Sequence, residues 1–173
     1  MSKIANIVAR AVVKTLDTAK KCQAAGLALI AGETKQNVEH IEPYGFTSAA
    51  HPGAEAVTLF PGGDRSHGVV IVIADRRYRL TGLQPGEVAL YTDEGDSIVM
   101  RRGKTIEINT SRLVVNAAER VEFNTPQIIA SGHYTGAGHV SDYRSTVDQI
   151  RSTYNIHTHR ASGGETSSPA QGM

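Results

Sequence analysis

A series of closely spaced apolar pairs between residues 98 and 130 restricts the fold more than any other feature of the sequence. The two members of each pair are two residues apart, the spacing at which side chains share one face of a β-strand. Successive pairs start seven or eight residues apart, with polar or turn-forming residues between them. This pattern predicts a run of very short strands, each with one narrow apolar stripe. The pairs are Ile98 and Met100, Ile106 and Ile108, Leu113 and Val115, Val121 and Phe123, and Ile128 and Ala130.

Such a ribbon cannot bury its apolar stripe against itself. Burial at about 25 cal/mol per Å² has to offset roughly 1 to 2 kcal/mol of backbone entropy for each ordered residue. Two apolar residues in each repeat do not supply that unless another chain covers the stripe. We therefore expect a three-chain prism, in which each copy contributes one wall and the strand edges are hidden. A single-chain β-solenoid is the competing arrangement, although it usually needs longer coils.

The chain before this repeat indicates a different, barrel-like architecture. Residues 55–60 form an apolar strand that ends at a Pro-Gly-Gly-Asp turn, and residues 88–91 form another after Gln84-Pro85-Gly86. Residues 68–74 are almost all β-branched, which predicts a strand buried on both faces. Four or five short strands within about 80 residues are typical of a small barrel, with the five-stranded Greek-key type as first choice.

Two interpretations compete at the start of the chain. Residues 4–12 have apolar positions at helical spacing and could form a short amphipathic helix. Alternatively, residues 11–17 and 22–31 form a β-hairpin with its turn at residues 19–21. The hairpin is favoured because Val12, Val13 and Thr15 are β-branched and Gly26 interrupts the next stretch.

The composition excludes several classes of protein. Eighteen basic residues face 17 acidic ones, so the sequence lacks the basic patch expected of a nucleic-acid-binding protein. The single Cys22 excludes an intrachain disulfide and fits a chain made in a reducing cytoplasm. We expect neither a secretory signal nor a membrane-spanning segment. Aromatic residues make up only 5% and Gly numbers 17, which favours thin strands and turns over a large core.

The most concentrated chemistry lies near the end of the chain, in residues 154–159, Tyr-Asn-Ile-His-Thr-His. On an extended strand, His157 and His159 project from the same face, whereas on a helix they would diverge. Two imidazoles are too few to close a structural metal site. The missing ligands must come from His133, His139 or other distant residues, or from other copies of the chain. The alternative is a polar tail with two exposed histidines.

Several stretches together resemble the central spike proteins of Mu-like contractile-tailed phages, also called the phage baseplate assembly protein V family. The end of the chain, residues 154–159 followed by Gly163-Gly164, Thr166 and Pro169, is similar to the tip motif of that family. The resemblance covers nearly the whole chain. The other stretches that carry it are Val38-Glu-His-Ile-Glu-Pro-Tyr-Gly-Phe-Thr-Ser48, Pro52-Gly-Ala-Glu-Ala56 and Leu59-Phe-Pro-Gly-Gly-Asp-Arg-Ser-His-Gly68.

This resemblance implies an all-β homotrimer without an enzymatic centre. Residues 1–92 would form an OB-fold collar, residues 93–150 an intertwined triple-stranded β-helical stem, and residues 151–173 a metal-binding tip. In relatives, two His from each chain hold one iron ion on the threefold axis, which transfers to His157 and His159. Six nitrogen ligands suit iron or nickel better than zinc, which prefers four. Calcium and chloride on the axis are further expectations, with Asp142, Asp148 or nearby Ser and Gln residues as ligands.

The implied role is mechanical. The protein would sit at the tail tip of the virion, contact other baseplate and tail-tube proteins, and pierce the host outer membrane without being inserted in it. Arg160 stands where many tips have Pro, and Ala161-Ser162 replace a more acidic turn. Residues 160–173 read alone would be a disordered tail, whereas after a metal site they could wrap as a cap.

Two other functions are open to test. A metal-dependent hydrolase would use His157, His159 and an acid such as Asp142, with an open coordination position and a general base. An OB-type binding module would use aromatic platforms and the basic stretch at residues 76–79. The triad-like Asp64-Arg65-Ser66-His67 is expected to be a structural turn, because consecutive residues cannot meet triad geometry. The aromatic candidates are Tyr44, Phe46, Phe60, Tyr78 and Tyr91.

Overall fold

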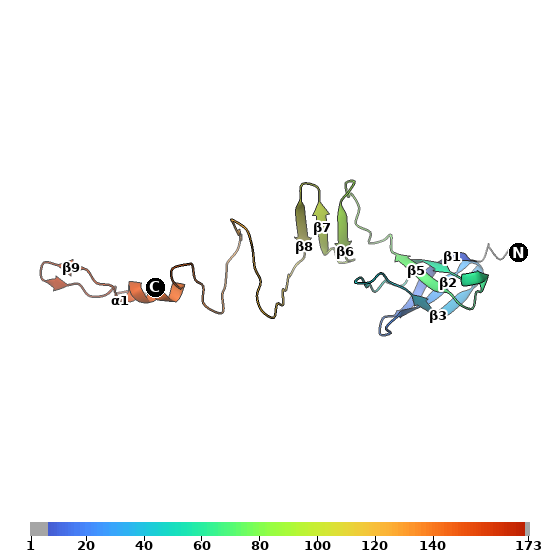
Figure 1. The fold of residues 1–173 in the computed structure, drawn as a ribbon, viewed down its shortest axis with the longest axis horizontal. Coiled ribbons are helices and arrows are strands. Elements are labelled where there is room, and N and C mark those ends of the chain that lie inside the picture. The colour runs from blue at the N-terminus through green and yellow to red at the C-terminus, as the bar shows by residue number, and fades with distance from the viewer. Residues whose placement is uncertain (1–6, 172–173) are drawn as a thin grey trace. The chain divides into compact units, whose positions relative to one another are not determined.

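A computed structural model describes residues 7–171 (Figure 1). The chain divides into two compact units, Met1–Val115 and Asn116–Met173, and each is described by itself. Ile4, the first position of the alternative opening helix, and the last two residues of the predicted tip lie outside the described residues. No helix within residues 7–171 is long and apolar enough to cross a membrane.

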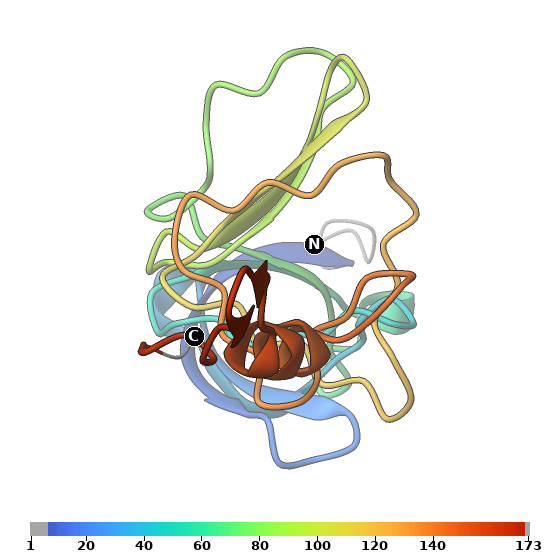
Figure 2. The ribbon, with the colours of Figure 1, turned by 90° about the vertical axis from the view of Figure 1, so that its left-hand side faces the viewer.

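The first unit begins with a closed five-stranded barrel in the order β1-β2-β3-β5-β4. All neighbours pair antiparallel except β3 and β5, which are parallel. Figure 2 shows the blue-to-green barrel strands curving around a common centre. The barrel is confirmed, and so is the opening hairpin over the helical alternative. The predicted barrel strand at residues 88–91 lies outside the barrel, because it pairs with the strand at residues 97–101. The strands are β1 (Val8–Asp17), β2 (Gln23–Leu29), β3 (Thr34–His40), β4 (Glu55–Leu59) and β5 (Val69–Ala74).

The barrel core follows from the alternation of side chains along each strand. In β1, Val13 is fully buried, while its neighbour Val12 is exposed. Phe60, directly after β4, is the largest fully buried side chain and closes one region of the core. The short 3-10 helix η2 (Ile30–Gly32) lies between β2 and β3, and η3 (Pro61–Gly63) lies between β4 and β5.

The expectation that β5 is buried on both faces was wrong. Val70 is fully buried, but Ile71 is 48% and Val72 46% exposed. A barrel wall has only one inner face, so a β-branched run does not need two covered sides to form a strand. A bulge opposite Val57 and Thr58 shifts the register, after which Ile73 packs against the core.

A three-stranded antiparallel meander follows the barrel, with β6 (Val88–Tyr91), β7 (Ser97–Arg101) and β8 (Thr105–Asn109). Its strands carry the first two predicted apolar pairs. Ile98 lies opposite Ile108, and Met100 opposite Ile106. Leu90 and Val88 extend the same row from β6. All six of these side chains are exposed, and we call them the meander face; the buried Val99 points the other way.

The three later pairs do not lie on strands, because the structure assigns no strand to residues 110–140. Their large apolar members, Leu113, Val115, Val121, Phe123 and Ile128, are all exposed. Within one chain these residues form no strands, since a strand needs a hydrogen-bonded neighbour, and the intertwined three-chain arrangement stays a prediction. A single-chain β-solenoid is contradicted, because its coils would pair with one another within this stretch.

Within residues 116–171, the second unit contains one helix and one small hairpin. Helix α1 spans Val147–Ile156, and β9 (Arg160–Ala161) pairs antiparallel with β10 (Gly164–Glu165). A helix at this place was not predicted. Figure 2 shows α1 and the segment after it in orange and red.

Candidate metal-binding tip

The two candidate ligands follow directly after α1. The helix begins with a capping box, in which the Thr146 side chain accepts a hydrogen bond from the Gln149 backbone N–H at 3.1 Å and the Gln149 side chain accepts one from the Thr146 N–H at 2.9 Å. It ends at Ile156, and His157 has extended dihedral angles, φ −68° and ψ 146°. The expected extended segment was thus wrong for residues 154–156 but right for His157.

The position of His157 fixes which of its ring nitrogens is available. Its Nδ1 lies 2.6 Å from the carbonyl oxygen of Tyr154. A carbonyl only accepts, so Nδ1 carries the proton and donates it, which leaves the Nε2 lone pair free in the neutral ring. Metal-binding histidines usually donate their second N–H to a carbonyl or carboxylate in this way. The end of α1 therefore holds the imidazole in a form that suits coordination.

His159 lies beside His157 and is held through its backbone. The centroids of the two imidazole rings are 5.0 Å apart, and the rings meet edge to face at 87°. The His159 N–H donates to the Thr166 hydroxyl at 2.9 Å, and the Thr166 N–H donates to the His159 carbonyl at 2.9 Å. The β9–β10 hairpin closes the loop between them. Residues 160–166 therefore fold back so that Thr166 lies beside the backbone of His159.

Three of the other candidate residues, His139, Asp142 and Asp148, form contacts elsewhere in the second unit. His139 Nδ1 lies 3.3 Å from a carboxylate oxygen of Asp148, which also pairs with Arg151. Asp142 accepts hydrogen bonds from the backbone N–H groups of Ser145 and Arg144, and these bonds lower the pKa of its carboxyl group. Asp142 thus ties a turn. Between residues 7 and 171, no group of three or more His, Cys, Asp and Glu side chains is placed to hold a metal.

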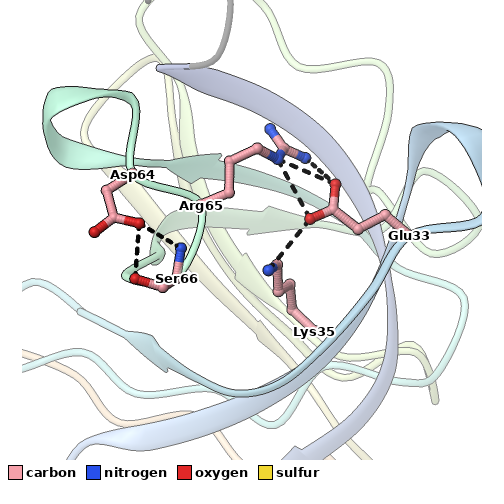
Figure 3. Close-up of polar contacts among 5 residues, drawn as sticks. All are labelled: Glu33, Lys35, Asp64, Arg65 and Ser66. Carbon is pink, nitrogen blue, oxygen red and sulfur yellow. Dashed lines mark hydrogen bonds and ion pairs between the residues drawn. The ribbon is translucent and has the colours of Figure 1, made fainter.

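In the barrel, the triad-like stretch is a turn, as predicted. The Ser66 N–H and hydroxyl both donate to Asp64 Oδ1, at 2.8 and 2.7 Å (Figure 3). The Ser66 oxygen lies 3.2 Å from His67 Nδ1. The serine therefore stands between the acid and the histidine, whereas a catalytic triad needs the histidine in the middle.

Arg65, which lies between Asp64 and Ser66 in this turn, contacts the segment that connects β2 and β3. The sequence did not predict this contact. Its guanidinium group pairs with the Glu33 carboxylate through two nitrogens, and Lys35 lies 3.3 Å from the same carboxylate (Figure 3). The hydrogen bond from Arg65 is the main cause of a lowered pKa of the Glu33 carboxyl group, and the contact with Lys35 lowers this pKa further. Arg65 also covers the Phe60 ring at 4.4 Å. No spacing signal links residues 33 and 65.

Several of the aromatic and arginine side chains expected on an OB-type binding surface instead make contacts within the first unit. Phe60 is a core residue and cannot serve as a stacking platform. Arg76 pairs with Glu55, and Arg77 pairs with Asp75 while also donating to the Pro52 carbonyl. Among the aromatic candidates, Tyr44, Phe46, Tyr78 and Tyr91 remain exposed.

Comparison with known proteins assigns the family. A family model described as Bacteriophage Mu Gp45, N-terminal, matches residues 10–77, which include all but the first two residues of the barrel strands. The chain is 30% identical to the "Baseplate puncturing device gp45" of Escherichia phage Mu, over 99% of this chain and 92% of that protein. The chain belongs to the Mu Gp45 family. It is also 31% identical to the "Mu-like prophage FluMu protein gp45" of Haemophilus influenzae, over 81% of each chain.

The similarity to Gp45 proteins extends over both units. The match to the phage Mu protein covers the tip as well as the barrel, since it leaves out only 1% of this chain. The resemblance noted in the sequence is thereby confirmed at the level of the family.

Proposed function

We propose that this chain is the central spike of a contractile phage tail. Three copies assemble around one axis, with the barrels as a collar and the stretch from the meander to the start of α1 as an intertwined β-helical stem, so the stem ends before the residue 150 expected from the sequence. The spike sits at the baseplate of the virion, bound to other baseplate and tail-tube proteins. It transmits the force of sheath contraction to the host outer membrane. The observation that carries the proposal is the near-full-length similarity to a protein named for puncturing.

The exposed apolar residues of the single chain support the trimer. The meander face presents six apolar side chains on one side of a small sheet, and the large apolar residues of the stretch 113–128 are also exposed. Soluble monomers rarely leave contiguous patches of this kind uncovered. Copies related by a threefold axis cover them and supply the strand neighbours that residues 110–140 lack within their own chain.

The tip is proposed to bind one iron ion for every three chains. His157 and His159 from each chain give six imidazole nitrogens, a number suited to octahedral coordination. The fixed Nδ1–H of His157 fits this role, because it leaves Nε2 as the ligand atom. When bound, the ion supplies cross-links between three chain ends. The residues themselves orient the imidazoles and close the cap. Axial calcium or chloride remains a prediction.

Sedimentation combined with elemental analysis of the purified chain tests the proposal. The expected result is a trimer that carries about one-third of an iron ion per chain, as six ligands from three chains require. One or more transition-metal ions per chain would contradict the shared site, and a monomer would contradict the spike.

Substitution of the ligands gives a sharper version of this test. His157→Ala should release the metal and loosen the tip while the trimer stays assembled, because the stem does not depend on the ion. His67→Ala is the matched control, since it removes an imidazole from a turn of the barrel in the first unit. Equal metal loss in both variants would exclude His157 as a specific ligand.

A further inference from the structure

Helix α1 carries an apolar stripe that its own chain leaves open. Val147, Ile150, Tyr154 and His157 follow one another at spacings of three, four and three residues. This is the a/d spacing of a coiled coil, in which every such residue faces a neighbouring helix. Ile150 is 48% and Tyr154 41% exposed, and α1 buries no residue in its own chain. We call these four residues the α1 seam.

The opposite side of α1 is polar and already has partners. Asp148 pairs with Arg151 one turn later and with His139 from the preceding loop. The seam side instead borders a groove of about 490 Å³. The groove is lined by Ser145, Gln149, Ile150, Thr153, Tyr154 and His157. The helix is therefore two-sided, with its own chain's ion pairs on one side and, on the other, an open groove in which Ile150 and Tyr154 are the large apolar side chains.

The length of α1 makes packing on the seam a requirement. It has ten residues, and isolated helices shorter than about 12 to 15 residues are marginal in water. The capping box at Thr146 stabilises its first turn, but it does not shield the apolar side chains. Some other surface has to cover Ile150 and Tyr154.

The seam itself identifies that surface as other copies of α1. Its last member is His157, which faces the shared axis if three chains complete the metal site, so the residues one and two turns earlier on the same side face the axis as well. Helices related by a rotation about that axis run parallel and in register. Val and Ile at the first two seam positions suit three- or four-stranded coils better than the Ile-and-Leu pattern of dimers.

We propose that three α1 helices pack in parallel through the α1 seam and form a short bundle directly before the His157 and His159 site. The inference rests on the proposed trimer. It adds the surface, the α1 seam, through which the chains pack so that the His157 and His159 side chains are aligned. Tyr154 has two roles in it. Its ring packs between helices, while its carbonyl oxygen orients the His157 ring at 2.6 Å. The bundle is a positioning device for the metal site.

Disulfide trapping in the full-length chain tests the bundle. Cys22 is exposed and is first replaced by Ser, which keeps a hydroxyl donor in place of the thiol that donates to the His40 carbonyl. Ile150→Cys is then compared with Ser152→Cys, which lies on the polar side of the same helix. Both proteins are oxidised mildly over a range of protein concentrations, and their oligomeric state and metal content are measured in parallel.

The expected result is that Ile150→Cys forms disulfide-linked pairs of chains at a rate independent of protein concentration, because the thiols meet inside one trimer. Ser152→Cys should link only by collision, at a rate that rises with concentration. If both variants are metal-loaded trimers but Ile150→Cys does not link faster, the bundle is refuted while the spike stands. If neither variant is trimeric, both proposals fail. Tyr154→Cys repeats the comparison if Ile150→Cys does not fold.

Discussion

We predict that the stability of the barrel depends on glycine at position 68, because this residue lies against the barrel core. A Cβ atom added there would lie 2.8 Å from Cε1 of Phe60 and 3.2 Å from Cγ2 of Thr58. Carbon atoms pack at about 3.5 to 4.0 Å, so the first contact is too short by roughly 0.7 Å. Both neighbours are fully buried and have no free space to retreat into. Overpacking of this kind costs about 1 to 3 kcal/mol, and we expect Gly68→Ala to destabilise the barrel by about 2 kcal/mol.

Amide hydrogen exchange of the β4 and β5 peptides measures this cost in the intact chain, independently of the stem. A loss of about 2 kcal/mol corresponds to roughly 30-fold faster exchange of the barrel amides. A second variant, Phe60→Leu, removes the ring atom that causes the clash. In that background the additional effect of Gly68→Ala should fall to about 0.5 kcal/mol or less, since residues in contact are not additive.

Two results would refute this reasoning. One is an exchange rate in Gly68→Ala within about twofold of the wild type, which would mean that the core accommodates the methyl group without cost. The other is an equal penalty for Gly68→Ala in the wild-type chain and in the Phe60→Leu background. Additivity would show that the cost arises from the backbone at residue 68 and not from the ring.

Two further predictions concern Glu33 and the start of α1. Arg65 lowers the pKa of Glu33 below 4.5, so the contact adds stability that is present above the ordinary pKa and is lost as the pH falls through the folded-state pKa. The difference in urea unfolding between wild type and Glu33→Gln should therefore shrink below pH 4.5, and a constant difference down to acid pH would contradict this. Thr146→Ala should destabilise α1 by about 1 kcal/mol through loss of the N-cap, seen as faster exchange of its amides, whereas Ser152→Ala should leave them nearly unchanged.

The barrel was predictable from the sequence because its signals are local. The β-branched residues of the stretch 11–17 and the abrupt Pro61-Gly62-Gly63 stop identify strands without knowledge of their partners. Burial was less predictable. The β-branched residues 69–74 are compatible with either one or two covered faces, and only the closed sheet shows that Ile71 and Val72 lie on the outside.

Near the end of the chain, the candidate ligands His157 and His159 were predicted from the sequence, but helix α1, which positions His157, was not. The expectation of an extended strand led away from α1, although Thr146 and Gln149 have the spacing of a capping box and Val147, Ile150 and Tyr154 have helical spacing. The hydrogen bond from His157 to the Tyr154 carbonyl could not be read from the sequence, because it depends on where the helix ends. The contact between Glu33 and Arg65 likewise depends on the closed barrel.

The exposed apolar surfaces favour symmetry over a set of unrelated partners. Three exposed apolar surfaces are distributed over the two units: the meander face, the stretch 113–128 and the α1 seam. Each of them needs a different kind of neighbour to cover it. The meander face needs a layer of side chains packed on it, and the stretch 113–128 needs strand neighbours. The α1 seam, in the arrangement proposed above, packs against parallel helices. Unrelated partners would have to match these demands one by one. A single rotation axis meets all of them at once, because each copy presents to its neighbours the same strands and the same helix that it needs itself.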